Sequence, residues 1–210
     1  NPAINDGATP LFIAAQNGHY EICKLIIANV DDKNPAKPNG NTPLSIAAHM
    51  GHYQICKLIV SNVLDKNPAN NDGVTPLHLA AKMGHFETFK LIFESLARDN
   101  NKNPRVYGGY TPLHIAAEIG NLKICKVIIE NVTEKNPATN NGSTPLHLAA
   151  GNGHLEIFEL ISKNVTVKNP KRNDGVTPQK LLAEYCQRCI SKAKISILGL
   201  IWRWFKNLWK

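Results

Sequence analysis

Histidine and cysteine are the residue types in this 210-residue sequence that could ligate a metal or transfer protons. Seven of the eight histidines recur at two fixed positions of a repeated pattern. A position occupied so regularly indicates a structural role, because a catalytic or metal site needs one local cluster. The first position is expected to open a helix, and the second to hydrogen-bond a helix start. Only His49 remains; the others are His19, His52, His85 and His154 at the first position, and His78, His114 and His147 at the second.

The cysteines also follow the repeat. Cys23, Cys56 and Cys125 share one position with Phe89 and Phe158, which predicts buried thiols that act as small apolar groups and stay reduced, as in a cytosolic protein. Cys186 and Cys189 form a single CxxC pair, whereas zinc would need two more nearby ligands. A structural role is favoured for this pair, with S-acylation as the alternative. Nucleotide, metal and hydrolase motifs are missing, so the sequence predicts neither an enzyme nor a cofactor.

An internal repeat must position these residues. The pair Thr-Pro occurs at Thr9, Thr42, Thr75, Thr111, Thr144 and Thr177, with spacings of 33, 33, 36, 33 and 33 residues. The pair Asn-Pro keeps the same spacing and divides the chain into six units, named unit one to unit six, which start near residues 1, 34, 67, 103, 136 and 169. Such a period is typical of stacked repeats.

Each unit reads as a turn followed by two helices. A tight-turn pair such as Asp72-Gly73 precedes Thr75, which can cap a helix, and Pro76 suits the first helical position. A glycine ends the first helix, and the second has apolar residues at helical spacing. One unit cannot bury its apolar face alone, so the expected fold is an all-α repeat solenoid of stacked turn-helix-helix units.

The unit resembles the ankyrin repeat. The runs TPLHLAA at 75–81 and 144–150, TPLHIAA at 111–117 and GHYEICKLII at 18–27 carry this resemblance. It covers residues 1 to about 184, with a degenerate sixth unit. It implies a protein-binding scaffold whose hairpin tips and first helices line a concave face. The sequence departs from the pattern at Phe12, Ser45 and Lys180, which replace the usual histidine of the TPLH tetrad.

The candidate partner-binding residues are those that the repeat leaves free on this implied concave face. Tyr107 and Tyr110 replace polar turn residues in unit four, and Met50, Met83 and Ile119 form an apolar line across units two to four. The alternative role for Met50, Met83 and Ile119 is packing between neighbouring helices, and for the two tyrosines it is covering the longer second helix expected in unit three. The remaining candidates are His49, Lys82 and Glu118. The partner is expected to be another protein and the chain a monomer.

The charge is concentrated at the C-terminal end. Residues 185–210 hold six of the 24 basic residues and none of the 16 acidic ones, which leaves 18 basic against 16 acidic residues in the repeat region. A near-neutral repeat region argues against a nucleic-acid partner. On a helix, residues 193–210 would have one broad apolar face and one basic stripe, which fits an interfacial membrane helix or a cap on the solenoid. The contact residues would be Trp202, Arg203, Trp204, Phe205, Lys206, Trp209 and Lys210.

The tail also supports a second functional hypothesis. The chain could be the cytosolic, membrane-proximal repeat domain of a larger channel or receptor, with the tail at an anionic membrane surface. Both hypotheses predict a cytoplasmic location, which the second one makes peripheral at a membrane.

Two further predictions concern structure. The 36-residue spacing and the pattern Phe89, Ile92, Phe93, Leu96 predict that the second helix of unit three is about one turn longer than its counterparts. In unit one, we expect Leu11, Ile22 and Leu25 to be partly exposed and this unit to fray first.

Overall fold

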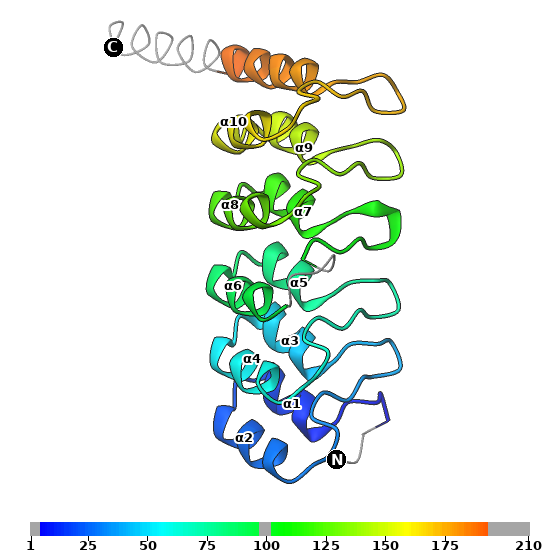
Figure 1. Ribbon diagram of the computed structural model, residues 1–210, viewed down its shortest axis with the longest axis vertical. Coiled ribbons are helices and arrows are strands. Elements are labelled where there is room, and N and C mark those ends of the chain that lie inside the picture. The colour runs from blue at the N-terminus through cyan, green and yellow to red at the C-terminus, as the bar shows by residue number, and fades with distance from the viewer. Residues whose placement is uncertain (1–4, 97–101, 193–210) are drawn as a thin grey trace, which may run out of the picture.

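The computed structural model describes residues 5–96 and 102–192, and these form a single stack of helical pairs (Figure 1). All regular structure in this part of the chain is helical, which confirms the predicted all-α solenoid. The first helices of units one to five are α1 (Pro10–Gln16), α3 (Pro43–Met50), α5 (Pro76–Lys82), α7 (Pro112–Ile119) and α9 (Pro145–Asn152). The second helices are α2 (Tyr20–Ala28), α4 (Tyr53–Val60), α6 (Phe86–Ser95), α8 (Leu122–Asn131) and α10 (Leu155–Lys163).

Two side chains satisfy the backbone at the start of helix α3. In unit two, Thr42 Oγ1 accepts a hydrogen bond from the N–H of Ser45 at 3.2 Å. Asn34 Oδ1, from the Asn-Pro pair ten residues earlier, accepts one from the N–H of Leu44 at 2.9 Å. Because the first turn of a helix has N–H groups with no partner inside the helix, these two residues define where the helix begins. The sequence suggested the role of threonine but gave no role to the asparagine.

The core lies between the two layers of helices. The leucine that follows Thr-Pro is fully buried in each of units one to five, as are the paired alanines of the inner units. Small alanines allow the first helices of neighbouring units to approach closely, and branched residues of the second helices fill the remaining space. The leucines are Leu11, Leu44, Leu77, Leu113 and Leu146.

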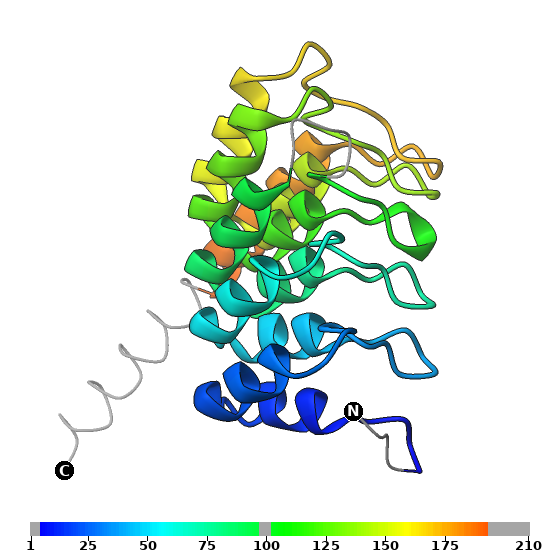
Figure 2. The same cartoon turned by 60° about the horizontal axis from the view of Figure 1, so that its bottom comes forward.

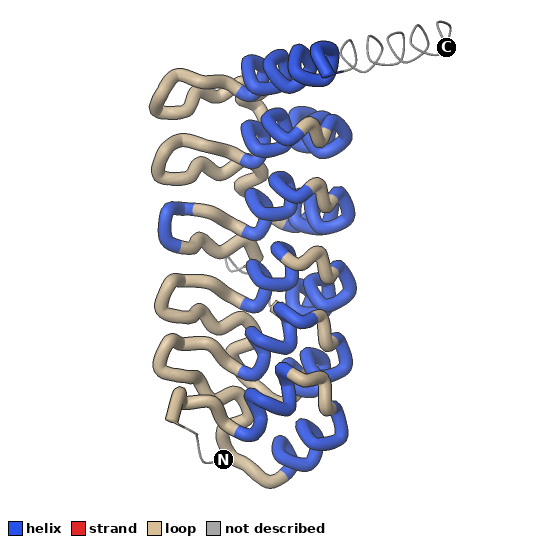
Figure 3. The backbone as a smooth tube through the Cα atoms, turned by 180° about the vertical axis from the view of Figure 1, so that it is seen from behind, coloured by secondary structure: helices blue, strands red, loops and turns tan. Residues whose placement is uncertain are grey.

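The hairpins project to one side of the stack in all units (Figures 1 and 3). Hydrogen bonds link neighbouring tips: the N–H of Asn71 donates to Asn39 O at 3.1 Å, and the N–H of Asn173 donates to Asn141 O at 3.1 Å. In unit four the tip contains a short 3₁₀ helix, η1 (Tyr107–Gly109). We call the surface formed by the hairpins and the first helices the groove face. A turned view shows the second helices on the side away from the hairpins (Figure 2).

The predicted extension of the second helix in unit three is wrong. Helix α6 has 10 residues, and α8, in a unit without extra residues, also has 10. Helix α6 ends at Ser95, and Leu96 at its C-cap has an extended backbone with ψ of 128°. The three extra residues therefore lie between Ser95 and Asn103. Apolar spacing predicted the face of the helix correctly but could not predict its end.

The two ends of the stack differ. Unit one exposes Ile22 and Leu25, as expected, but Leu11 is fully buried because α1 packs against α3. In unit six, residues 178–192 form one uninterrupted helix instead of two, which agrees with the missing Gly-His step. This helix crosses residues 184 and 185, where we placed the boundary between repeats and tail.

Candidate functional site

The TPLH histidines stabilise the starts of the first helices. His114 Nδ1 accepts a hydrogen bond from the N–H of Thr111 at 3.2 Å, so Nε2 carries the proton and donates to Ser143 O of the next unit at 3.2 Å. His147 makes the same pair of contacts, whereas His78 Nε2 has no partner among the described residues. Burial lowers the pKa of both His78 and His114 to about 4. These imidazoles are therefore neutral structural groups.

The histidines that open the second helices connect neighbouring units. The Nε2 of His52 lies 3.1 Å from Gln16 O, that of His85 lies 3.1 Å from His49 O, and that of His154 lies 3.0 Å from Glu118 O. Each ring thus reaches a carbonyl near the end of the preceding first helix. At the contact, Gly51 has φ of 75°, and a Cβ there would lie 2.7 Å from the His85 ring. The sequence placed these histidines at helix starts but could not show that they bridge two units.

The cysteines provide no reactive centre in the repeats. Cys23, Cys56 and Cys125 are buried, and burial raises the pKa of Cys23 to about 11 and those of Cys56 and Cys125 to about 12. A thiol with a raised pKa is a poor nucleophile at neutral pH. Cys186 and Cys189 are exposed on the helix at residues 178–192. Within residues 5–96 and 102–192, no group of three potential ligands could hold a metal ion.

The apolar candidates on the groove face are exposed at the ends of three neighbouring first helices. Met50 ends α3, Met83 is the C-cap of α5, and Ile119 ends α7, with 46%, 46% and 44% of each residue exposed. We call these three residues the apolar row. Helix α5 packs against both α3 and α7, so the three positions are held in series. Nearly half of each residue is open to solvent, and the rest is covered by neighbouring side chains.

The polar candidates beside the apolar row occupy one equivalent position in three units. His49 is half-buried, whereas Lys82 and Glu118 are exposed. The backbone carbonyls of His49 and Glu118 accept the inter-unit bonds from His85 and His154. The structure therefore places a half-buried imidazole, an ammonium and a carboxylate in succession along the groove face.

The two tyrosine candidates do not act together. Tyr107 begins η1 at the hairpin tip, and 94% of it is exposed. Tyr110 is half-buried, and its ring centroid lies 5.3 Å from that of His114. Tyr110 therefore packs beside the buried imidazole, whereas Tyr107 projects from the tip.

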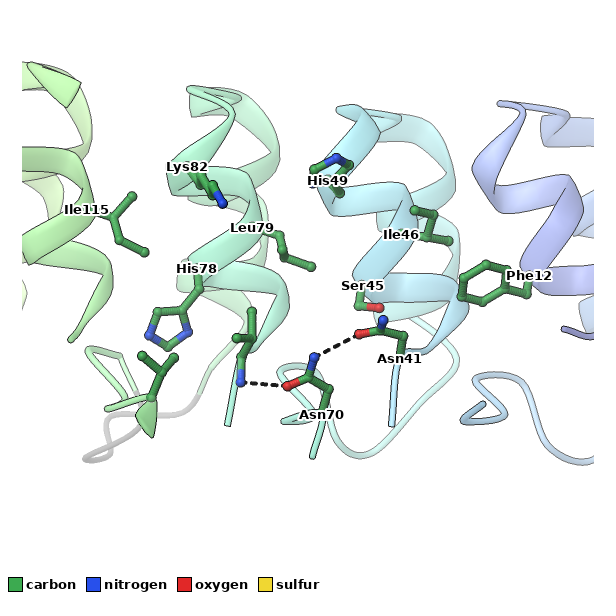
Figure 4. Close-up of a pocket in the computed structure, with 12 residues that line it drawn as sticks. Phe12, Asn41, Ser45, Ile46, His49, Asn70, His78, Leu79, Lys82 and Ile115 are labelled. Atoms are coloured by element: carbon green, nitrogen blue, oxygen red, sulfur yellow. Dashed lines mark hydrogen bonds between the residues drawn. The ribbon is translucent and has the colours of Figure 1, made fainter. Parts of the chain in front are cut away.

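A cavity of about 450 Å³ opens on the groove face, lined by residues of units one to four that include Ser45 (Figure 4). It lies where unit two has serine instead of the imidazole found in units three to five. The sequence showed this replacement, but we did not connect it with a hollow. We call it the Ser45 cavity; its lining residues include Phe12, Ile46, His49, Val74, Leu79, Lys82 and Ile115.

The tail candidates lie outside the described residues. These are Trp202, Arg203, Trp204, Phe205, Lys206, Trp209 and Lys210, all within 193–210. None of the helices in the described part of the chain is both long enough and apolar enough to cross a membrane.

Comparison with known proteins supports the repeat assignment. A family described as "Ankyrin repeats (3 copies)" matches residues 11–104 and 96–174, which together span more than half of the chain. No curated protein matches the sequence. Ankyrin repeats are generally protein–protein interaction modules and typically non-catalytic. The match covers the same hairpins, paired helices and bridging histidines described above, and the chain belongs to the ankyrin-repeat family.

Proposed function

We propose that this chain is a protein-binding scaffold that contacts its partner with the groove face of units two to four. The observation that carries the proposal is the apolar row. The equivalent positions in units one and five are polar, namely Asn17 and Asn152. Apolar residues therefore occur at this exposed position only in the middle units among units one to five. A continuous exposed apolar strip on a folded surface is typical of an interaction site.

The stack also lowers the cost of binding. Each residue of the row is fixed at a helix end, and histidine bridges at 3.0 to 3.1 Å join unit one to two, two to three and four to five. Units three and four are joined by the packing of α5 on α7. A surface that is already ordered loses little conformational entropy when a partner docks. His49, Lys82 and Glu118 would add polar contacts beside the row, and the exposed Tyr107 is an additional aromatic contact at the tip of unit four.

The test is a quantitative pull-down from the native cells. The bait pair is the triple variant Met50→Gln, Met83→Gln, Ile119→Gln and the control Leu64→Gln, which changes a fully exposed apolar residue in the return loop after α4. We expect the triple variant to lose the partner by about tenfold or more, equivalent to about 1.4 kcal/mol, with an unchanged melting temperature. Equal recovery with both variants would contradict the proposal.

In this scaffold role we propose that the chain acts as a monomer, without catalytic activity and without a cofactor. The three buried free thiols support a reducing compartment such as the cytoplasm.

A second candidate function, membrane contact through the tail, rests on sequence. The six basic residues and three tryptophans of residues 185–210 favour an anionic surface, and each basic residue near such a surface contributes about 1 kcal/mol. The full chain should sediment with phosphatidylserine-containing vesicles, whereas a chain ending at Lys192 should not. Negligible sedimentation of both, with a lower melting temperature for the truncated chain, would favour a cap on the solenoid.

A further inference from the structure

The Ser45 cavity exists because one position of the repeat carries a small residue between two large ones. The equivalent residues on either side are Phe12 in unit one and His78 in unit three, and all three line the cavity. In Figure 4, Ser45 lies between the Phe12 ring and the His78 imidazole. In units four and five the imidazole at this position reaches a carbonyl of the next hairpin, Ser143 O from His114 and Val176 O from His147. Serine is too short to do so, and the space stays open.

The polar side chains of Ser45, Asn41 and Asn70 at the cavity are already paired, whereas Nε2 of the lining residue His78 has no partner among the described residues. Ser45 Oγ accepts from the N–H of Thr42 at 2.9 Å and donates to Thr42 O at 2.8 Å. Asn70 donates from Nδ2 to Asn41 Oδ1 at 3.0 Å, and its Oδ1 accepts from the N–H of Val74 at 2.8 Å. The two bonds of Asn70 are drawn as dashed lines in Figure 4. An occupant would therefore gain more from apolar contact than from hydrogen bonds to the floor.

The remaining wall is apolar. Ile46, Leu79 and Ile115 extend from three successive first helices, and Val74 comes from the hairpin of unit three. The volume of about 450 Å³ lies within the range of about 300–1,000 Å³ that is usual for binding pockets. The cavity thus fits one bulky apolar side chain together with the adjoining backbone.

The charge at the cavity has one sign. Among the described residues that line the cavity, Lys82 is the only one with a permanent charge, and none is Asp or Glu. His49 occupies the equivalent position to Lys82 in the preceding first helix. None of the ion pairs in the described part of the chain includes Lys82, whereas Lys37, which lies over the Phe12 ring at 4.9 Å, is paired with Asp6 at 2.8 Å. Lys82 therefore remains available to a carboxylate.

We propose that the Ser45 cavity receives a leucine, isoleucine, methionine or phenylalanine side chain from a partner segment, and that Lys82 pairs with an acidic residue next to it. This proposal rests on the proposed protein-binding function and assigns it a ligand chemistry. The apolar side chain gives most of the affinity, because it is removed from water in a pre-formed cavity. The ammonium sets the orientation and the preference for acidic segments.

The probe for the test is a phage library of random short peptides, selected on the full chain. Enriched peptides should carry one of these apolar residues within three positions of Asp or Glu. Affinities of individual peptides are then measured by fluorescence anisotropy. The decisive variant is Ser45→His, which installs the residue that units three to five use at this position. Its Nδ1 can cap Thr42 as His114 caps Thr111, so the fold is retained while the cavity is filled.

Ser45→His should weaken the selected peptides by about tenfold or more, with an equal or higher melting temperature. Lys82→Gln should weaken peptides with an acidic residue by about threefold to tenfold and leave their neutral analogues unchanged. The matched control is Lys126→Gln, which removes an exposed lysine from α8.

The outcomes separate the two proposals. Peptides that bind Ser45→His as tightly as the wild type would overturn the cavity assignment, and so would a selection that yields no peptide. The pull-down with the apolar-row variant decides the scaffold function independently of either result.

Discussion

Units one and two share the same hairpin and helical pair, yet the same positions have different surroundings. Ile22 in α2 is 50% exposed, whereas its counterpart Ile55 in α4 is 1% exposed. His19 is exposed, whereas its counterpart His52 lies 3.1 Å from a carbonyl of unit one. The difference arises because unit two has a neighbour on its N-terminal side in the described stack, and unit one has none there. In a repeat, the position within the unit determines which contact a side chain can make. The presence of a neighbouring unit determines whether that contact forms and contributes to stability.

Acidification should destabilise units three to five, which contain buried imidazoles, more than units one and two, which carry Phe12 and Ser45 at the same position. The pKa of His78 and His114 is about 4 in the folded chain and 6.5 ordinarily. Between these values the unfolded chain binds protons that the folded chain does not. Stability is therefore complete above pH 6.5 and falls as the pH decreases to 4, by on the order of 3 kcal/mol for each imidazole.

The measurement is urea unfolding at pH 7 and pH 4.5 for the wild type and His114→Ser, which copies the cap of unit two. The variant should be less stable at pH 7 but lose less stability on acidification. Identical losses in the two proteins would show that His114 does not control the acid response.

The same truncation at Ile55 and Ile22 should show the contribution of the neighbouring unit directly. Ile55→Ala leaves a hole in the contact with unit one and should cost about 2–5 kcal/mol in the free energy of unfolding. Ile22→Ala removes a half-exposed side chain and should cost less than about 1 kcal/mol. Both values come from urea unfolding followed by circular dichroism. Similar costs would mean that unit one is covered in solution.

Amide hydrogen exchange should follow the same gradient. Helices α1 and α2 are packed from one side only, so they should open more often than α3 and α4. We expect exchange in residues 10–28 to be about tenfold or more faster than in residues 43–60. Mass spectrometry of peptides from both regions in one sample provides the measurement. Uniform protection across the units would be inconsistent with fraying from unit one.

The smallest effect concerns the bridging histidines. His85→Ala removes the bond to His49 O and should cost about 1 kcal/mol, within the usual range for one hydrogen bond. His19→Ala should change stability by less than about 0.5 kcal/mol, because its ring is exposed. Thermal unfolding of both variants and of the wild type measures these two changes in stability. A comparable loss for His19→Ala would indicate that helix capping, and not the bridge, explains the histidine.

The sequence by itself determined the architecture and most of its local chemistry. The Thr-Pro spacing defined the units, the glycines marked the ends of first helices, and recurrence identified the histidines of the two repeated positions as structural, of which His19 alone is exposed and forms no bridge among the described residues. These inferences succeed because caps and turns depend on residues close together in the chain. The exposure of Met50, Met83 and Ile119 also followed from the repeat, since the other positions are used for packing.

Only the tertiary structure decided the properties that depend on several units at once. The end of α6 at Ser95 and the burial of Leu11 differ from the predictions, and the packing of Tyr110 on His114 could not be foreseen from the sequence. The Ser45 cavity depends on residues from units one, two, three and four, which are up to about a hundred positions apart. A missing imidazole is visible in the sequence, but whether neighbours fill the space is decided by packing, because cavities are defined by the atoms that surround them.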